Sequence, residues 1–313
     1  MVAATFCTAL KHLSLPDTLP KNGRVGDWLY LTKQFSDIEE RFPYTVIRLI
    51  GTVEYNHLAN ASGIVYGKTN FHPSEDPYKV LDKFLGELEI FLQCTWMIKD
   101  NSANFDTGFL IYEIGDKTYV SSNIMSTMFF QCTGDRHVAS FSFNELKEAV
   151  RIFENTEAVP RVPGTTRTQL TSSVERINRA NYFIQSARDT SDLGNKIADY
   201  CSAFEALLAT NPQELSHQLS ERVAALLGGS PNEKWAIYRE IKQAYQVRSK
   251  IVHGSGIKTG KLDELLEISK TCDQRIRECV NLYFSSPRVR RAIDADAATL
   301  DEFLVKKVFG KND

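Results

Sequence analysis

The stretch SPNEKWAIYREIKQAYQVRSKIVHG, residues 230–254, is the most informative part of this sequence for the fold. Ser230 is a favourable helix cap, and Pro231 suits the first helical position because its missing N–H has no helical partner there. Gly254 stands where helices commonly end, since glycine adopts a left-handed conformation easily. The stretch therefore predicts one long helix.

A helical wheel indicates which side of this helix is buried. Five residues share one apolar stripe at roughly 100° per residue: Trp235, Tyr238, Ile241, Tyr245 and Val252. Arg248 lies beside the stripe, where an unpaired guanidinium would be costly. We therefore expect an acidic partner, a dimer interface or a phosphate near it. His253 lies roughly 140° away from Arg248, so a single regular helix points the two side chains in different directions.

The segments around this helix are also helical. Starting and stopping signals delimit TSSVERINRANYFIQSARD (171–189), which begins with Ser/Thr caps, DLGNKIADYCSAFEALLAT (192–210) and NPQELSHQLSERVAALLGG (211–229), which begins with an Asn-Pro cap. A further helix is predicted from Lys261 to about Phe284. Short connections between such helices predict an antiparallel bundle over 170–285, followed by a helical tail over 286–313.

The first 165 residues predict a separate domain of mixed α and β structure. Residues 43–55 and 107–125 are rich in β-branched and aromatic residues, and GDK at 115–117 suggests a hairpin, so we expect a small antiparallel sheet. Helices are predicted over 74–96 and 144–153. Two prolines, a glycine and several Thr and Ser indicate a linker over 154–173.

Composition restricts the class of protein. With 313 residues, 42% of them hydrophobic and 24% charged, the chain can form two ordinary cores. No signal peptide or membrane-spanning segment is evident, and the six cysteines lack CxxC spacing, so we expect a cytoplasmic protein with reduced, mostly buried thiols and no membrane partner. Residues 1–166 carry 15 basic and 20 acidic side chains, whereas 167–291 carry 19 and 14. The basic segment suits a polyanion such as RNA, although such a difference often arises by chance.

Three motifs in order, AFEALLA (203–209), ELSHQLSERVAALLG (214–228) and IKQAYQVRSKIVHG (241–254), resemble the HEPN superfamily, most closely its Apea-like group. The resemblance covers about residues 171–284. It is more specific than the spacing of Arg248 and His253, which arises by chance in chains of this composition. Residues 1–165 resemble no family that we recognise.

The resemblance implies an all-α bundle that forms a homodimer and, in many members, a metal-independent endoribonuclease without a cofactor. By position, Arg248 and His253 are the catalytic pair, and Ser249 occupies the polar position after the arginine. It also suggests an antiphage, abortive-infection or toxin effector, with a phage-derived or other protein trigger acting on the N-terminal domain. HEPN toxins regulated by nucleotide transfer carry a tyrosine two residues after the histidine, but this chain has Ser255.

Other residues have weaker claims to a role in this site. Glu205, or the pair Glu221 and Arg222, could contact Arg248; His217 is more simply a solvated histidine. Lys250, Lys242 and Arg239 are candidates for contacts with RNA phosphates. The aromatic residues of the apolar stripe, Trp235, Tyr238 and Tyr245, suit a buried core better than a surface that stacks on bases. The alternative function is a non-catalytic dimeric HEPN scaffold or RNA-binding module whose N-terminal domain binds the partner, and a buried, fully paired Arg248 would favour it.

Overall fold

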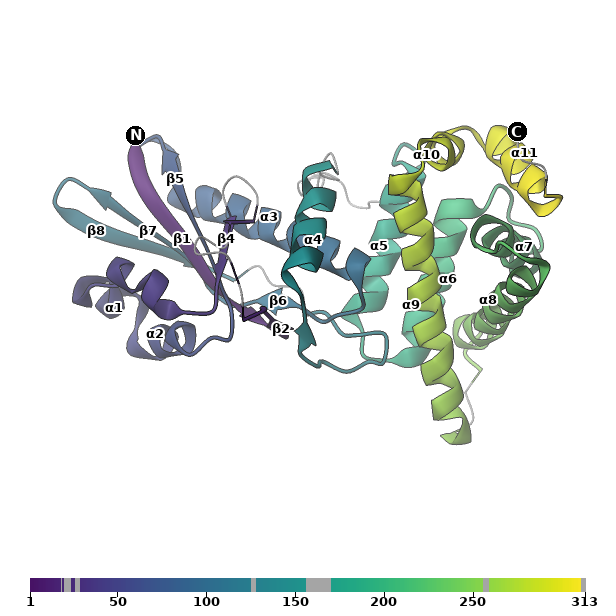
Figure 1. The fold of residues 1–313 in the computed structure, drawn as a ribbon, viewed down its shortest axis with the longest axis horizontal. Coiled ribbons are helices and arrows are strands. Elements are labelled where there is room, and N and C mark those ends of the chain that lie inside the picture. The colour runs from purple at the N-terminus through teal and green to yellow at the C-terminus, as the bar shows by residue number, and fades with distance from the viewer. Residues whose placement is uncertain are drawn as a thin grey trace. The chain divides into compact units, whose positions relative to one another are not determined.

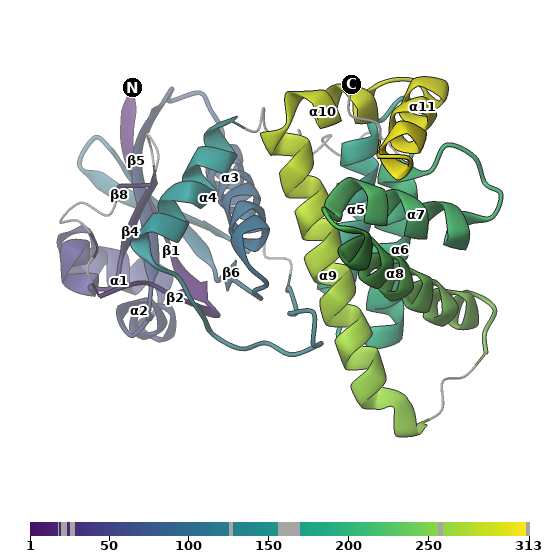
Figure 2. The same ribbon diagram turned by 45° about the vertical axis from the view of Figure 1, so that its right-hand side comes forward.

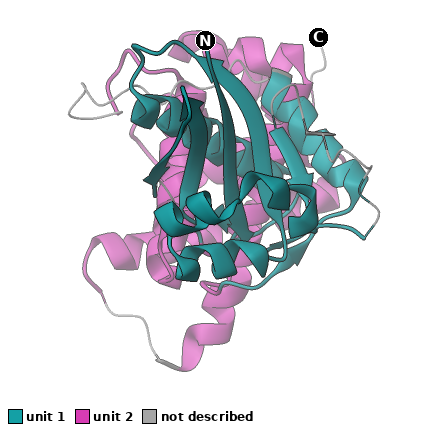
Figure 3. Ribbon diagram, turned by 90° about the vertical axis from the view of Figure 1, so that its left-hand side faces the viewer, with its two compact units in different colours: residues 1–129, 136–158 teal, residues 130–135, 159–313 magenta. Residues whose placement is uncertain are grey.

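The computed structural model describes residues 1–17, 19, 24–25, 29–124, 128–155, 170–255 and 259–310. The chain divides into two compact units (Figure 3). Unit 1 comprises residues 1–129 and 136–158, and unit 2 comprises residues 130–135 and 159–313. Most of the expected linker, 156–169, lies outside the described residues.

Unit 1 is built on an antiparallel sheet with the order β3-β4-β5-β1-β7-β8, in which the short β6 extends the pairing of β1. The strands are β1 (Val2–Lys11), β3 (Arg24–Val25), β4 (Leu29–Thr32), β5 (Ile64–Phe71), β6 (Asn104–Phe105), β7 (Gly108–Ile114) and β8 (Lys117–Asn123). A separate parallel pair joins β2 (Leu13–Ser14) to β9 (Ala139–Ser140). The N-terminal antiparallel sheet is therefore as predicted.

Helices cover both faces of this sheet, with α3 on one side and α1 and α2 on the other (Figure 1). Successive residues of β1 enter different cores: Phe6 stacks on Phe84 of α3 at 4.8 Å between ring centroids, and Cys7 packs with Val46 of α1. Because both faces are buried, β1 is almost continuously buried. The helical segments are η1 (Phe35–Asp37), η2 (Glu39–Arg41), α1 (Tyr44–Ile50), α2 (Thr52–Ala59), α3 (Pro77–Ile98) and α4 (Phe143–Asn155).

The hairpin and both helices predicted in unit 1 are confirmed by β7–β8, α3 and α4. Gly115 has a φ of 60° at the first turn position, which suits a type II′ turn. The strand predicted over 43–55 is wrong, because α1 and α2 form there instead. The residues of α1 that face the core, Val46, Ile47 and Ile50, recur at helical spacing. Their packing in the core outweighs the local preference of β-branched residues for a strand.

Unit 2 is helical, and α6 packs against α5, α8 and α9 (Figure 2). Its helices are α5 (Arg176–Asp189), α6 (Leu193–Leu208), α7 (Leu215–Leu227), α8 (Pro231–Val252), α9 (Leu262–Ser285), α10 (Pro287–Asp294) and α11 (Ala297–Val308), with the short η3 (Thr259–Lys261) before α9. Tyr200 of α6 donates a hydrogen bond to Asp273 of α9 at 2.8 Å inside the bundle. The helical segments predicted after residue 170 are confirmed.

The helix caps were predicted with mixed success. Ser230 forms a full capping box with Glu233, as expected for α8. The Ser/Thr cap of α5 is wrong, because the cap residue is Glu175. The Asn-Pro cap of α7 is also wrong: the side chain of Asn211 accepts a hydrogen bond from the Gln213 amide and holds a turn, so α7 starts only after Glu214.

All six cysteines are free and buried, as expected from their spacing. Among the described residues, no helix has both the length and the apolar character needed to cross a membrane.

Candidate functional site

Arg248 and Glu205 meet between α8 and α6, the helices that carry the third and the first sequence motif of the resemblance. The Nη2 atom of Arg248 lies 3.2 Å from Oε1 of Glu205 and 3.5 Å from Oε2. The side chains retain only 27% and 21% of their exposure. The expected contact between Glu205 and Arg248 is therefore present, in a half-buried setting that strengthens it relative to a surface ion pair.

Tyr245, one turn before Arg248, completes this cluster. Its hydroxyl lies 3.2 Å from Oε1 of Glu205 and 3.2 Å from the carbonyl oxygen of Cys201, and it has one proton to donate. Burial, with Cys201 and Glu205 nearby, raises the pKa of Tyr245 well above its usual range. The hydroxyl thus stays protonated and helps to fix the Glu205 carboxylate that holds Arg248.

The Arg248 guanidinium is not fully paired. Its Nε atom is buried and has no hydrogen-bond partner among the described residues. Glu205 contacts the side chain through Nη2, whereas a guanidinium carries five N–H donors over three nitrogens. A planar fork with spare donors suits an oxyanion such as phosphate.

His253 ends α8 in a conformation determined by the glycine after it. The Gly254 amide donates to the Ile251 carbonyl at 3.0 Å, and the Ser255 amide donates to the Lys250 carbonyl at 2.8 Å. Gly254 has a φ of 68°, so these bonds form a Schellman motif. The His253 side chain is exposed and makes no hydrogen bond or ion pair with the described residues. The histidine is therefore held at a defined helix end with its imidazole open to solvent.

The buried face of α8 differs from the predicted stripe. Ile241 and Tyr245 are buried as expected, but Trp235 and Val252 are 60% and 56% exposed, so their assignment to the core is wrong. The buried residues of α8 are Ile237, Ile241, Ala244, Tyr245 and Val247. On the wheel they run from roughly 120° to 280°, which places Arg248, at roughly 220°, within the buried face rather than beside it.

The weaker candidates occupy other surfaces. Arg239, Lys242, Ser249 and Lys250 of α8 are exposed. Glu221 and Arg222, the other residues considered as contacts of Arg248, are engaged elsewhere. Glu221 lies 3.3 Å from His217, and Arg222 pairs with Asp301 of α11.

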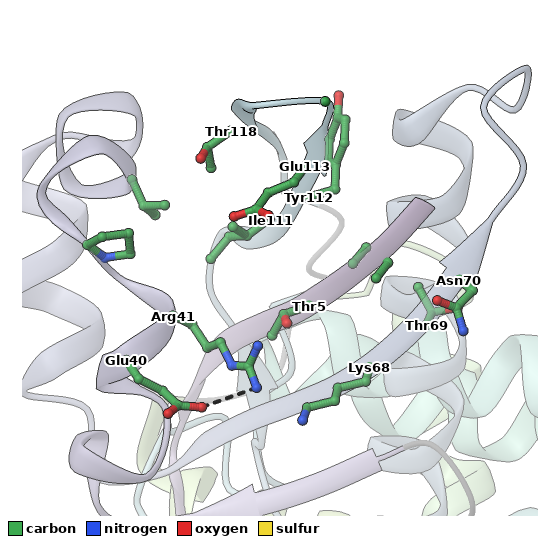
Figure 4. Close-up of a pocket in the computed structure, with 15 residues that line it drawn as sticks. Thr5, Glu40, Arg41, Lys68, Thr69, Asn70, Ile111, Tyr112, Glu113 and Thr118 are labelled. Atoms are coloured by element: carbon green, nitrogen blue, oxygen red, sulfur yellow. Dashed lines mark ion pairs between the residues drawn. The ribbon is translucent and has the colours of Figure 1, made fainter. Parts of the chain in front are cut away.

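Unit 1 holds a hollow that the sequence did not predict. It has a volume of about 620 Å³ and is lined by residues of β1, β5, β7 and β8 and of the segment 40–46 (Figure 4). Arg41 extends over the sheet towards Thr5 and Lys68, and its guanidinium lies 3.1 Å from Glu40. Prediction of this hollow would have required β1 and β5, neither of which has a strong local signal.

No family model, curated protein or solved structure matches the chain. The similarity to the HEPN superfamily stays a prediction from the three sequence motifs.

Proposed function

We propose that this chain is a metal-independent endoribonuclease of HEPN type that acts as a homodimer. The observation that carries the proposal is the state of Arg248: Glu205 holds it through Nη2, yet the side chain stays 27% exposed, so other N–H donors of the guanidinium remain for a further oxyanion. His253, at the end of the same helix, supplies a solvent-exposed imidazole for proton transfer.

The chemistry requires little beyond these groups. RNA contains its own nucleophile, the 2′-hydroxyl, so the protein has only to remove a proton, donate one and stabilise negative charge on the phosphorane. Arg248 would provide the charge and His253 the proton transfer. In-line attack requires a base and an acid on opposite sides of the phosphate, and each chain has one such histidine. A second protomer related by a two-fold axis would supply the other.

The alternative, a non-catalytic dimeric scaffold or RNA-binding module, also has a specific observation in its favour. Arg248 is half-buried and paired with Glu205, whereas His253 lies on the opposite side of α8. An arginine retained only for its ion pair would have this geometry. The ribonuclease therefore requires a phosphate bound to the Arg248 donors that Glu205 leaves free, whereas the scaffold does not.

The test is cleavage of single-stranded RNA by the purified full-length chain. We expect cleavage to persist with EDTA, to leave a 2′,3′-cyclic phosphate, and to fail on an oligonucleotide that is 2′-deoxy at the cleaved position. His253→Ala and Arg248→Ala should each reduce cleavage at least a hundredfold. His72→Ala, which alters an exposed histidine of unit 1, should leave it unchanged.

A mixed-dimer assay tests whether the site is shared. The wild-type chain is held at constant concentration and mixed with increasing His253→Ala chain, so that each mixed dimer keeps both arginines but only one of the two histidines that the joint site needs. We expect cleavage to fall as the variant is added, whereas a site contained within one chain would leave it unchanged. Intact dimers that cleave no RNA in either wild-type or mixed form would support the scaffold.

A further inference from the structure

The exposed face of α8 begins with a platform of stacked aromatic rings. Trp235, 60% exposed, stacks almost parallel to Tyr238, with 5.4 Å between ring centroids and 8° between ring planes. Burying an indole normally stabilises a protein, so an indole held flat and open to solvent is unusual for a soluble bundle.

Neighbouring side chains hold this platform in place. His217 of α7 packs edge-on against Tyr238 at 5.7 Å, and Lys242 donates to the Tyr238 hydroxyl at 3.2 Å while lying 5.3 Å from the ring centroid. A surface that is ordered before binding loses less entropy when a ligand docks on it.

Three cationic side chains and the imidazole of His253 continue from the platform along the same face. At roughly 100° per residue, Arg239, Lys242, Lys250 and His253 all lie within about 60° of Trp235, over about 27 Å of helix. We call this set, together with Trp235 and Tyr238, the α8 strip. The acidic residues of α8, Glu233 and Glu240, lie roughly 140–160° from Trp235.

Carboxylates from adjacent helices border the strip at two points. Glu221 of α7 lies beside His217, and Glu264 of α9 is bonded to Lys261 and Gln243 and lies near Lys250. Both are engaged with partners of their own, so the strip keeps a surplus of positive charge.

We propose that the α8 strip binds single-stranded RNA, with a base stacked on Trp235 and the following phosphates carried past Arg239 and Lys242 towards His253. The inference rests on the proposed function, since it takes RNA as the ligand and specifies its unpaired form. Every base has a flat face that can stack on an indole, and cations along a groove follow the backbone without reading sequence.

Two other occupants fit the strip less well. The bases of a duplex are already stacked on one another and offer no free face to Trp235. A second copy of this chain packed along the strip would place two rows of like charge against each other, which opposes association. An unpaired polyanion satisfies both the rings and the charges.

The experiment measures binding without cleavage. A fluorescein-labelled, 2′-O-methylated oligouridine of twelve nucleotides is titrated with the full-length chain, and the same oligonucleotide paired with its complement serves for comparison. We expect Trp235→Ala to weaken single-strand binding about five- to a hundredfold, as loss of one stacked base does. Trp235→Phe should retain part of the affinity, and Tyr182→Ala, which removes another exposed aromatic from unit 2, should retain all of it.

The outcomes separate this inference from the ribonuclease proposal. Equal binding by wild type and Trp235→Ala would overturn the inference, and so would a dimer that falls apart on this substitution, since the face would then be a protein interface. Binding that depends on Trp235, in a chain that never cleaves RNA, would support the α8 strip and contradict the ribonuclease. Cleavage that Trp235→Ala leaves unchanged would support the ribonuclease and contradict the α8 strip.

Discussion

Arg248 and Glu205 form an ion pair at a position where two neutral side chains often serve stability equally well. The Glu205 contact offsets the desolvation of the guanidinium, but the buried Nε donor without a partner costs about 1–3 kcal/mol. Replacing a buried ion pair by neutral groups is often neutral or stabilising, whereas removing one partner leaves an uncompensated charge.

Stability measurements on this pair test the argument at the residue scale. We expect Arg248→Met to lose about 1–3 kcal/mol of unfolding free energy, because Glu205 is then left half-buried without its cation. Adding Glu205→Gln should restore most of this loss, since the amide keeps an acceptor for Tyr245. Urea denaturation of the single and double variants gives the coupling energy. A double variant less stable than either single one would refute this account.

The end of α8 is determined at the scale of the element, by backbone geometry. The Schellman bonds of Gly254 and Ser255 require a left-handed residue, which glycine adopts without strain. The backbone geometry therefore sets the position of the His253 imidazole, since this side chain makes no hydrogen bond or ion pair with the described residues.

Substitution of Gly254 therefore changes both the stability and the position of the histidine. Gly254→Ala should destabilise unit 2 by about 1 kcal/mol, and Gly254→Asn by less, because asparagine tolerates the left-handed region. The readouts are thermal denaturation and hydrogen exchange at the Ser255 amide. Equal protection of that amide in wild type and Gly254→Ala would contradict the assignment of the cap.

Elements with strong local signals were predictable from the sequence. Helix α8 has its cap, its proline and its terminal glycine within one stretch, and the β7–β8 hairpin has its turn between the two strands. In contrast, β1 and β5 were missed, because β1 is buried on both faces and lacks the alternation that marks a half-buried strand.

The candidate site was predictable in part for a similar physical reason. The helical wheel placed Arg248 close to the buried face and anticipated an acidic partner, and the structure places Glu205 there. Trp235 was assigned to the core because an aromatic ring was counted as apolar. The structure shows that α7 packs against α8, that Ile237 is buried and that the Trp235 indole is exposed.

At the scale of the whole molecule, buried thiols make stability depend on alkaline pH. Burial raises the pKa of Cys7 in unit 1 and of Cys272 in unit 2 to about 12, from 9.0 for a free thiol. The folded state therefore holds these protons more tightly than the unfolded state. The corresponding stability is complete below pH 9 and is lost as the pH rises from 9 towards 12.

A variant without one thiol isolates this effect. Below pH 9, Cys272→Ala should be less stable than wild type because it removes buried atoms. Between pH 9 and 12 the wild type should lose about 1.4 kcal/mol more per pH unit than the variant, so the difference between them shrinks. Guanidinium denaturation at pH 8 and 11 measures it. Two curves that stay parallel with pH would show that the Cys272 thiol does not titrate in this way.

The central place of β1 in its sheet also has a consequence during synthesis. Its partner β7 begins at Gly108, so a ribosome adding about 5–20 residues per second delivers it roughly 5–20 s after β1. Throughout that interval a strand with two apolar faces has no complete sheet to join. We therefore expect newly made chains of this protein to be prone to aggregation until β7 has been translated.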